Sequence, residues 1–351
     1  MKADAAVKAP LVAGLVLATA LAVAPRALPA ASGPVTCSLS GVSTLDFGSI
    51  TPLGASVTDV SPAFTITCSA LKNDFPGGPA PFPVNLCASY NNGTGGASGG
   101  GNRQLLNGGN IALYDVYPTA AFGPTHWGSR AGTPTGTVVQ ASVTLVKPTG
   151  AANTASAPVS TNLSTFARLF GGQTTLPPGL YNSNLTLTVE AFWTADKSDC
   201  AAGGTPNTTT ATQTAQVTYQ KECRVGTVST LDFGSSGFLT SNLDNTTTVS
   251  VTCTSTTAYK IGLDAGLGSG ATTTNRKMTR TSAPLNTVGY SLFRDNLRTL
   301  NWGNDTVGGT DTKNGTGDGL AASHTIYGRV APQTTPVPGS YQDTVVLSVV
   351  F

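Results

Sequence analysis

An eight-residue segment of the sequence occurs twice without a single change. Val42–Ser49 and Val228–Ser235 both read Val-Ser-Thr-Leu-Asp-Phe-Gly-Ser. The two copies lie much farther apart than the roughly 20–50 residues of a solenoid repeat, so they indicate two related domains rather than a repeat array. We place these domains at residues 32–220 and 221–351.

The cysteines occur at equivalent positions around the two copies of this repeat. Each copy of the octapeptide is preceded by one cysteine at the same distance and followed by another at nearly the same distance, which pairs these two in each domain. Two cysteines of the first domain then remain and pair by exclusion, although four cysteines allow three connectivities. The expected disulfides are Cys37–Cys68, Cys223–Cys253 and Cys87–Cys200.

The N-terminus has the layout of a secretory signal peptide. Two lysines precede an apolar run over 11–24, and cleavage is expected near Ala30 or Ala31, which makes residues 1–31 the signal. The alternative is a membrane anchor, but the run is shorter than the roughly 20 residues of a spanning helix. Export leads to an oxidising compartment, where an even number of cysteines favours disulfides over a metal site.

The composition favours an all-β protein that does not bind nucleic acid. Only 10% of the residues are charged, the formal net charge is +2, and there are 41 glycines. A net charge so close to zero lacks the excess of basic residues that binding to nucleic acids requires. Abundant threonine and valine favour strands, and abundant glycine favours turns.

Alternation of apolar and polar residues indicates strands in both domains. The pattern is clearest over 181–193 and is typical of a half-buried antiparallel strand. Shorter runs lie at 63–68, 84–90, 111–117, 249–253, 259–263 and 290–293. Clusters of Gly, Asn and Pro separate them, so we expect a pair of immunoglobulin-like β-sandwich domains.

The two domains are expected to differ at their last strand. In the first domain, 181–193 is followed by a further alternating run, 211–219, that can close the sandwich. In the second domain, 341–351 matches 181–193 and no closing run follows, so this domain is expected to lack its final strand. Such an open edge invites aggregation unless another chain supplies a strand. The expected acceptor groove consists of Leu231, Phe233, Tyr341, Val345, Leu347, Val349 and Phe351.

The sequence also predicts that the chain accepts a strand without donating one. Only about five residues separate the expected cleavage site from Cys37, whereas a strand that fills a groove needs about ten. Head-to-tail assemblies propagate only where both surfaces exist. We therefore expect this chain to end a linear assembly.

Several short motifs of the second domain resemble those of one known module. They are Val249–Cys253, Tyr290–Asp295, Asn301–Gly303, Ile326–Arg329 and Pro338–Thr344, in this order. Together they resemble the spore coat protein U domain, which is the pilin module of archaic chaperone-usher pili. The first domain shows the resemblance more weakly, because its loops are longer and it has two extra cysteines.

A two-domain member of this family resembles the tip adhesin of such pili. The resemblance implies a periplasmic chaperone that fills the groove first, an outer-membrane usher, and a donor strand from the next pilin subunit. It implies export through the periplasm to the cell surface. The implied function is attachment to surfaces and biofilm formation.

Three loops of the first domain are expected at the end remote from the second domain, because the closing strand runs toward the linker. They are 73–83, 117–127 and 194–209. The resemblance implies that such loops present apolar side chains to an apolar abiotic or host surface, and large apolar patches do mark interaction sites. The expected contact residues are Phe75, Pro76, Phe82, Tyr117, Phe122 and Trp127. Alternatively, some of them fold back as core, as Trp302 at the place equivalent to Trp127 suggests.

Other functions stay open at this stage. One is a self-assembling coat or matrix protein, and another is a lectin-like carbohydrate binder that uses Tyr90, Asn91 and Tyr117. An enzyme is not expected, because His126 and His324 fall in different domains and cannot form one catalytic or metal site. No cofactor is expected either.

One turn-rich segment, 304–319, superficially resembles a calcium loop. Its acidic residues are Asp305, Asp311 and Asp318. They lack the alternate spacing and the terminal Glu of an EF-hand. We therefore expect a solvated hairpin loop without a metal.

Overall fold

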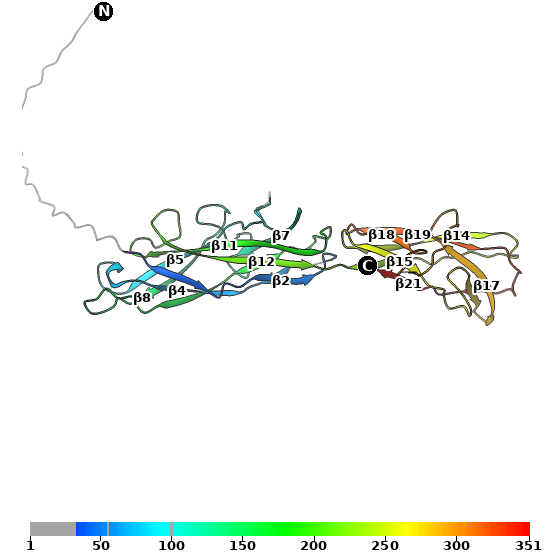
Figure 1. Cartoon of the computed structure of the whole chain (residues 1–351), viewed down its shortest axis with the longest axis horizontal. Coiled ribbons are helices and arrows are strands. Elements are labelled where there is room, and N and C mark those ends of the chain that lie inside the picture. The colour runs from blue at the N-terminus through cyan, green and yellow to red at the C-terminus, as the bar shows by residue number, and fades with distance from the viewer. Residues whose placement is uncertain (1–32, 55, 99–100, 306) are drawn as a thin grey trace, which may run out of the picture.

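The structure, a computed structural model, consists of two β domains joined end to end (Figure 1). It describes residues 33–54, 56–98, 101–305 and 307–351. Strands up to Tyr219 pair only with one another, and so do strands from Cys223 onward. Within the described ranges, no helix is long and apolar enough to cross a membrane. The predicted signal peptide lies outside the described residues.

The first domain packs a three-stranded sheet, β1-β4-β9, against a larger sheet. Its elements are β1 (Thr36–Ser40), β2 (Leu45–Ile50), β3 (Thr58–Val60), β4 (Ala63–Ser69), η1 (Lys72–Asp74), β5 (Phe82–Tyr90), β6 (Arg103–Asn107), β7 (Asn110–Tyr117), β8 (Val139–Leu145), β9 (Val159–Ser164), β10 (Phe166–Leu169), β11 (Gly179–Trp193) and β12 (Asn207–Tyr219). The larger sheet has the order β2-β12-β11-β6-β7-β10-β3, and β5 joins β11 to β8. One apolar cluster fills the interior.

β11 is a central strand of the larger sheet in the first domain. Its alternate residues from Tyr181 to Trp193 are buried on one face, which is the arrangement that the alternating sequence predicts. Its early part pairs with β6 and its later part with β5. Along its other edge it pairs with β12 from Gly179 to Ala191. β12 thus closes the first domain.

The second domain has a six-stranded sheet, β13-β14-β19-β17-β16-β20, and a three-stranded sheet, β18-β15-β21. Its elements are β13 (Cys223–Val228), β14 (Leu243–Cys253), β15 (Ala258–Leu263), β16 (Arg276–Arg280), β17 (Ala283–Phe293), β18 (Lys313–Thr316), β19 (Ala321–Val330), β20 (Tyr341–Gln342) and β21 (Leu347–Val350). A second, separate apolar cluster lies between these sheets.

The last segment of the second domain is not the continuous strand that its alternation suggests. β20 pairs with β16 and β21 pairs with β15, so the chain changes sheets between them. Carboxylates take the place of a strand partner in this gap: Thr344 N–H donates to Asp343 at 2.8 Å. Val346 N–H donates to Asp264 at 2.9 Å. These side chains satisfy main-chain donors that a regular ladder would otherwise satisfy.

A buried tryptophan and a buried arginine recur in both domains. The carbonyl oxygen of Trp127 accepts a hydrogen bond from Arg103 at 2.7 Å, and that of Trp302 accepts one from Arg276 at 2.8 Å. Each indole N–H donates to a main-chain carbonyl of the same domain. The two domains therefore share a core arrangement as well as a sequence motif.

The domains meet at a short junction. Gln220 N–H donates to the carbonyl oxygen of Ile50 at 2.8 Å. The Thr51 hydroxyl donates to the carboxylate of Glu222, which also accepts from Arg224 at 2.7 Å. Since β2 and β12 pair in parallel, both strands run toward the second domain side by side.

Candidate functional site

The second domain carries an open groove of about 480 Å³ beside its copy of the octapeptide. The apolar lining consists of Val228, Leu231, Phe233, Leu263, Met278, Leu292, Ile326, Val345 and Leu347. The polar lining includes Thr247, Tyr290, Tyr341 and Asp343. A concave surface that combines apolar side chains with polar groups is typical of a binding site.

The predicted groove residues fall into two sets. Leu231, Phe233, Tyr341, Val345 and Leu347 line the groove. Val349 packs against the core cluster of the second domain without lining the groove. Phe351 is 52% exposed and lines a separate hollow of about 570 Å³ beside β15 and β18.

The repeated octapeptide is an internal control for this groove. In the first domain Leu45 and Phe47 are 0% and 3% exposed. In the second domain the same letters give Leu231 and Phe233, which are only half-buried. Because the local sequences are identical, the difference comes from what covers them.

The cover in the first domain is β12, which lies between β2 and β11. Ala215 pairs with Leu45 in parallel register and with Ser183 in antiparallel register. The buried side chains of β12 are Gln213, Ala215, Val217 and Tyr219. In the described part of the second domain no strand takes this place, since β13 ends at Val228 and β21 pairs only with β15.

The segment corresponding to β11 shows the same loss of cover. It keeps the alternation, with exposed residues between inward-facing ones, but Tyr341, Val345, Leu347 and Val349 are only half-buried. Each Å² of apolar surface left in water forgoes about 25 cal/mol of stabilisation. An open edge also leaves main-chain donors and acceptors without strand partners. The groove therefore leaves apolar side chains of the second domain partly in contact with water.

Asp343 and Tyr290 are hydrogen-bonded to each other in the polar part of the groove. The Tyr290 hydroxyl donates to Asp343 Oδ2 at 2.7 Å, and Leu267 N–H donates to Asp343 Oδ1 at 2.8 Å. Burial, followed by this bond to a carboxylate, raises the pKa of Tyr290, so the hydroxyl stays a donor. Burial lowers the pKa of Arg276, and the charge of Asp343 acts in the opposite direction.

The predicted aromatic contact surface is not exposed in the first of the three loops. Phe75 and Phe82 are 5% and 7% exposed, and their rings pack edge to face at 5.2 Å. Phe75 also contacts Trp193 at 5.0 Å between ring centroids. Pro76 beside it is half-buried. The prediction is wrong here because the end of β11 offers the loop an apolar partner distant in sequence.

The second loop also turns its aromatic residues inward. Trp127 is fully buried and Tyr117 is buried. Phe122 is half-buried, with its ring 5.4 Å from that of Tyr117 and the guanidinium of Arg168 4.1 Å above it. The six residues therefore do not form an exposed apolar surface, and the alternative in which they fold back as core describes this structure.

The residues of the carbohydrate-binding hypothesis are also engaged in contacts within the first domain. The Tyr90 hydroxyl is buried, where it donates to Gln213 at 2.5 Å and contacts the Thr165 hydroxyl at 2.7 Å. The Asn91 amide donates to Thr186 at 3.2 Å. These polar groups are occupied by the fold.

The acidic segment of the second domain binds its own main chain. Asp305 accepts from Gly308 N–H at 2.7 Å, and Asp311 accepts from Asp305 N–H at 2.9 Å. Over the described ranges, no three His, Cys, Asp or Glu side chains gather as a metal site. The two histidines lie apart, His126 against Asp115 and His324 against Tyr259.

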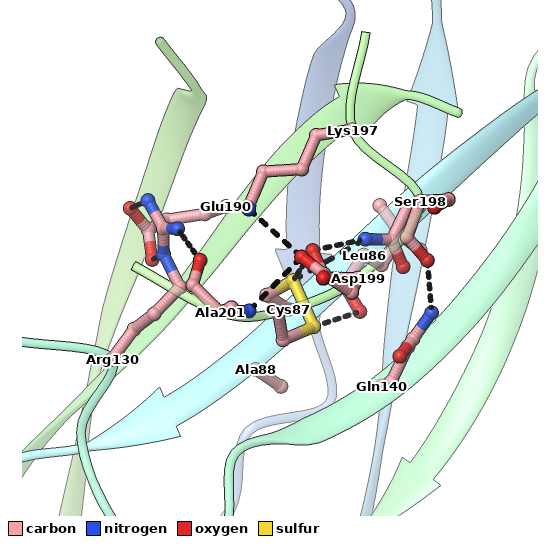
Figure 2. The surroundings of a disulfide bond; sticks show 12 residues. Leu86, Cys87, Ala88, Arg130, Gln140, Glu190, Lys197, Ser198, Asp199 and Ala201 are labelled. Atoms are coloured by element: carbon pink, nitrogen blue, oxygen red, sulfur yellow. Dashed lines mark hydrogen bonds and ion pairs between the residues drawn. A yellow bond between two sulfur atoms is a disulfide. The ribbon is translucent and has the colours of Figure 1, made fainter. Parts of the chain in front are cut away.

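Three disulfides stabilise the two domains. They are Cys37–Cys68, Cys87–Cys200 and Cys223–Cys253, the same pairs that the sequence predicts. The second of them ties β5 to the loop 194–206 (Figure 2). Around it, Arg130 contacts Glu190 at 2.5 Å, and Lys197 contacts Asp199 at 2.8 Å. The loop that leads into β12 is thus anchored to β5 through Cys200.

Removal of this disulfide is expected to destabilise the first domain by about 4–5 kcal/mol, because it closes a loop of 113 residues. The variant is Cys87→Ser with Cys200→Ser, measured by calorimetry of the full chain. Cys37→Ser with Cys68→Ser is the control and is expected to cost less, since its loop spans 31 residues. Equal costs would contradict the argument from loop length.

The fold and the groove together define an all-β protein of two domains, the second of which carries an open groove. The chain belongs to the Spore Coat Protein U domain family, whose profile matches it twice, at residues 27–188 and 209–348. Comparison with curated protein sequences finds no match.

Solved structures similar to this chain include several adhesins. One is the tip subunit in the CsuC–CsuE chaperone-tip adhesion subunit pre-assembly complex of archaic chaperone-usher Csu pili from Acinetobacter baumannii, with 14% identity, a TM-score of 0.48 and coverage of 90% of this chain and 100% of that one. The CupB6 tip adhesin of Pseudomonas aeruginosa is 10% identical, with a TM-score of 0.40 and coverage of 91% of this chain and 94% of that one. CfaE, the adhesive subunit of CFA/I fimbria of enterotoxigenic Escherichia coli, is 12% identical, with a TM-score of 0.31 and coverage of 88% of this chain and 92% of that one.

Proposed function

We propose that this chain is the tip adhesin subunit of a chaperone-usher pilus and that its second domain accepts a donor strand from the next subunit. The observation that carries the proposal is the contrast between the two copies of one octapeptide. β12 covers the first copy, and an open groove flanks the second. Family membership supports the same function.

The first domain supplies a template for the direction of the donor strand. β12 runs parallel to β2 and antiparallel to β11. In the second domain, a strand in this orientation runs parallel to 228–235 and antiparallel to β21. The end of β21 lies beside the domain junction (Figure 1), so the donor strand runs away from the first domain. The next subunit then lies at the far end of the second domain.

This geometry leaves the first domain at the free end of a head-to-tail assembly. Such heterologous contacts build linear fibres when each subunit fills the site of its neighbour. A domain with an open edge is prone to aggregate before assembly. A periplasmic chaperone that occupies the groove first, and an outer-membrane usher at which the donor strand replaces it, meet this need. The mature protein then resides at the pilus tip on the cell surface and mediates attachment.

The proposal predicts that a supplied strand stabilises the second domain. The test chain carries a second copy of residues 207–219 after Phe351, joined by about four Gly and Ser residues as in a hairpin. We expect the melting temperature of the second domain to rise by about 10 °C, since about 2 kcal/mol of stabilisation shifts a domain of this size by that amount. Calorimetry of the full mature chain measures it.

A matched control carries serine at the copied positions of Val217 and Tyr219, whose side chains are buried in the first domain. This chain is expected to melt like the unfused protein. Equal melting temperatures for both fusions would contradict strand acceptance and would favour a self-assembling coat or matrix protein.

A further inference from the structure

The buried arginine of each domain needs a negative charge, and the two domains place that charge differently. In the first domain Arg103 forms an ion pair with Asp115, and both side chains are essentially inaccessible. Arg103 pairs across strands with Tyr114. Ser183 of β11 is fully buried in the same core. The compensating charge thus lies inside the completed core.

Among the described residues of the second domain, no carboxylate forms an ion pair with the equivalent arginine, Arg276. Arg276 donates instead to the carbonyl oxygens of Asp264, Thr273, Leu263 and Trp302. It pairs across strands with Tyr290, as Arg103 does with Tyr114. The residue after Tyr290 is Ser291, where the first domain has Asp115.

In the second domain, a carboxylate whose charge acts on Arg276 lies in the wall of the groove. Asp343 aligns with Ser183, because Tyr341 and Tyr181 follow equivalent Pro-Gly turns. Its carboxylate accepts from Tyr290 at 2.7 Å and, together with the charge of Asp264, acts on Arg276 through space. It also lines the open groove. The position that is a neutral serine in the closed domain is therefore an anion in the open one.

A donor strand in the register of β12 places one of its residues directly opposite this anion. In the first domain, Ala215 of β12 pairs with Ser183, and both side chains are fully buried. Directly opposed residues of an antiparallel pair have Cβ atoms about 4.5–5.5 Å apart. Like charges at that separation destabilise the pairing, and more so once the strand excludes water.

We propose that Asp343 makes the groove selective for the charge of its donor strand. The donor residue that faces Asp343 is small and not acidic, so that the carboxylate stays balanced by Arg276 and by the Tyr290 hydroxyl when the groove is covered. This inference rests on the proposed strand acceptance and names a property of the partner: an alternating apolar strand that carries no Asp or Glu at this one inward position.

The test uses the fusion described above, with either Asp or Asn at the copied position of Ala215. These two residues have nearly the same shape and differ in charge. In the chain with Asp343, we expect the Asp fusion to melt about 8 °C lower in the second domain than the Asn fusion. In the Asp343→Asn chain, which keeps the acceptor for Tyr290, the gap is expected to fall below about 2 °C. Asp343→Ser, which restores the residue of the first domain, must give the same small gap.

A second acid tests whether the effect belongs to this position. Asp232 also lines the groove but is exposed and accepts from Gly234 N–H at 2.8 Å. Asp232→Asn is expected to keep the full gap between the two fusions. An unchanged gap in Asp343→Asn overturns this inference alone. A failure of the unaltered fusion to stabilise the second domain overturns the proposed function and this inference with it.

Discussion

Phe47→Ala is expected to destabilise the first domain by about 4 kcal/mol, whereas Phe233→Ala, the same change in the same octapeptide, is expected to cost the second domain less than about 1.5 kcal/mol. Phe47 is 3% exposed in β2, the strand beside β12. Phe233 is half-buried at the edge of the groove. A cavity costs its full amount only where the removed side chain was enclosed.

The two phenylalanine rings contact tyrosines at equivalent positions of the two domains, which makes the comparison well matched. Phe47 lies 6.1 Å from Tyr114, and Phe233 lies 6.0 Å from Tyr290, both edge to face. Calorimetry of the full chain gives both costs. With the donor strand fused, the cost of Phe233→Ala is expected to rise toward that of Phe47→Ala. Equal costs in the unfused chain would show that the second copy is already covered.

The second large effect concerns the buried ion pair of the first domain. Asp115→Asn is expected to destabilise that domain by about 3–5 kcal/mol, because it keeps the side-chain shape but leaves Arg103 charged without its buried partner. The exposed pair of Arg168 and Asp59 is the control. Asp59→Asn is expected to cost at most about 1 kcal/mol, since water already screens that pair. Denaturant unfolding of the full chain measures both, and similar costs would contradict a buried charge at Asp115.

Much of this fold follows from patterns that need no three-dimensional information. The exact repeat predicts two related domains, and the cysteines that accompany it predict pairs found in the structure. Period-two alternation predicts β11 and β12, because a strand with one buried face requires it. The predicted groove depends on the same alternation in residues 341–351.

The loop aromatics could not be placed in this way. A loop has no periodicity, so nothing local tells whether Phe75 faces water or Trp193, its partner at the far end of β11. For Trp127 one signal was present, since Trp302 occupies the same place in the second domain. The division between β20 and β21 was likewise hidden, because it depends on Asp264, a residue far away in sequence.

The path of β12 determines how the first domain bears a pulling force. β12 leads directly to the junction with the second domain, and it pairs with β11 from Asn207 to Tyr219. A load applied through the second domain therefore pulls β12 along its own axis. All of its ladder bonds to β11 then resist in shear at once, whereas a strand peeled from one end breaks them singly. The closing strand β12 is in this way the strand through which the first domain bears the load.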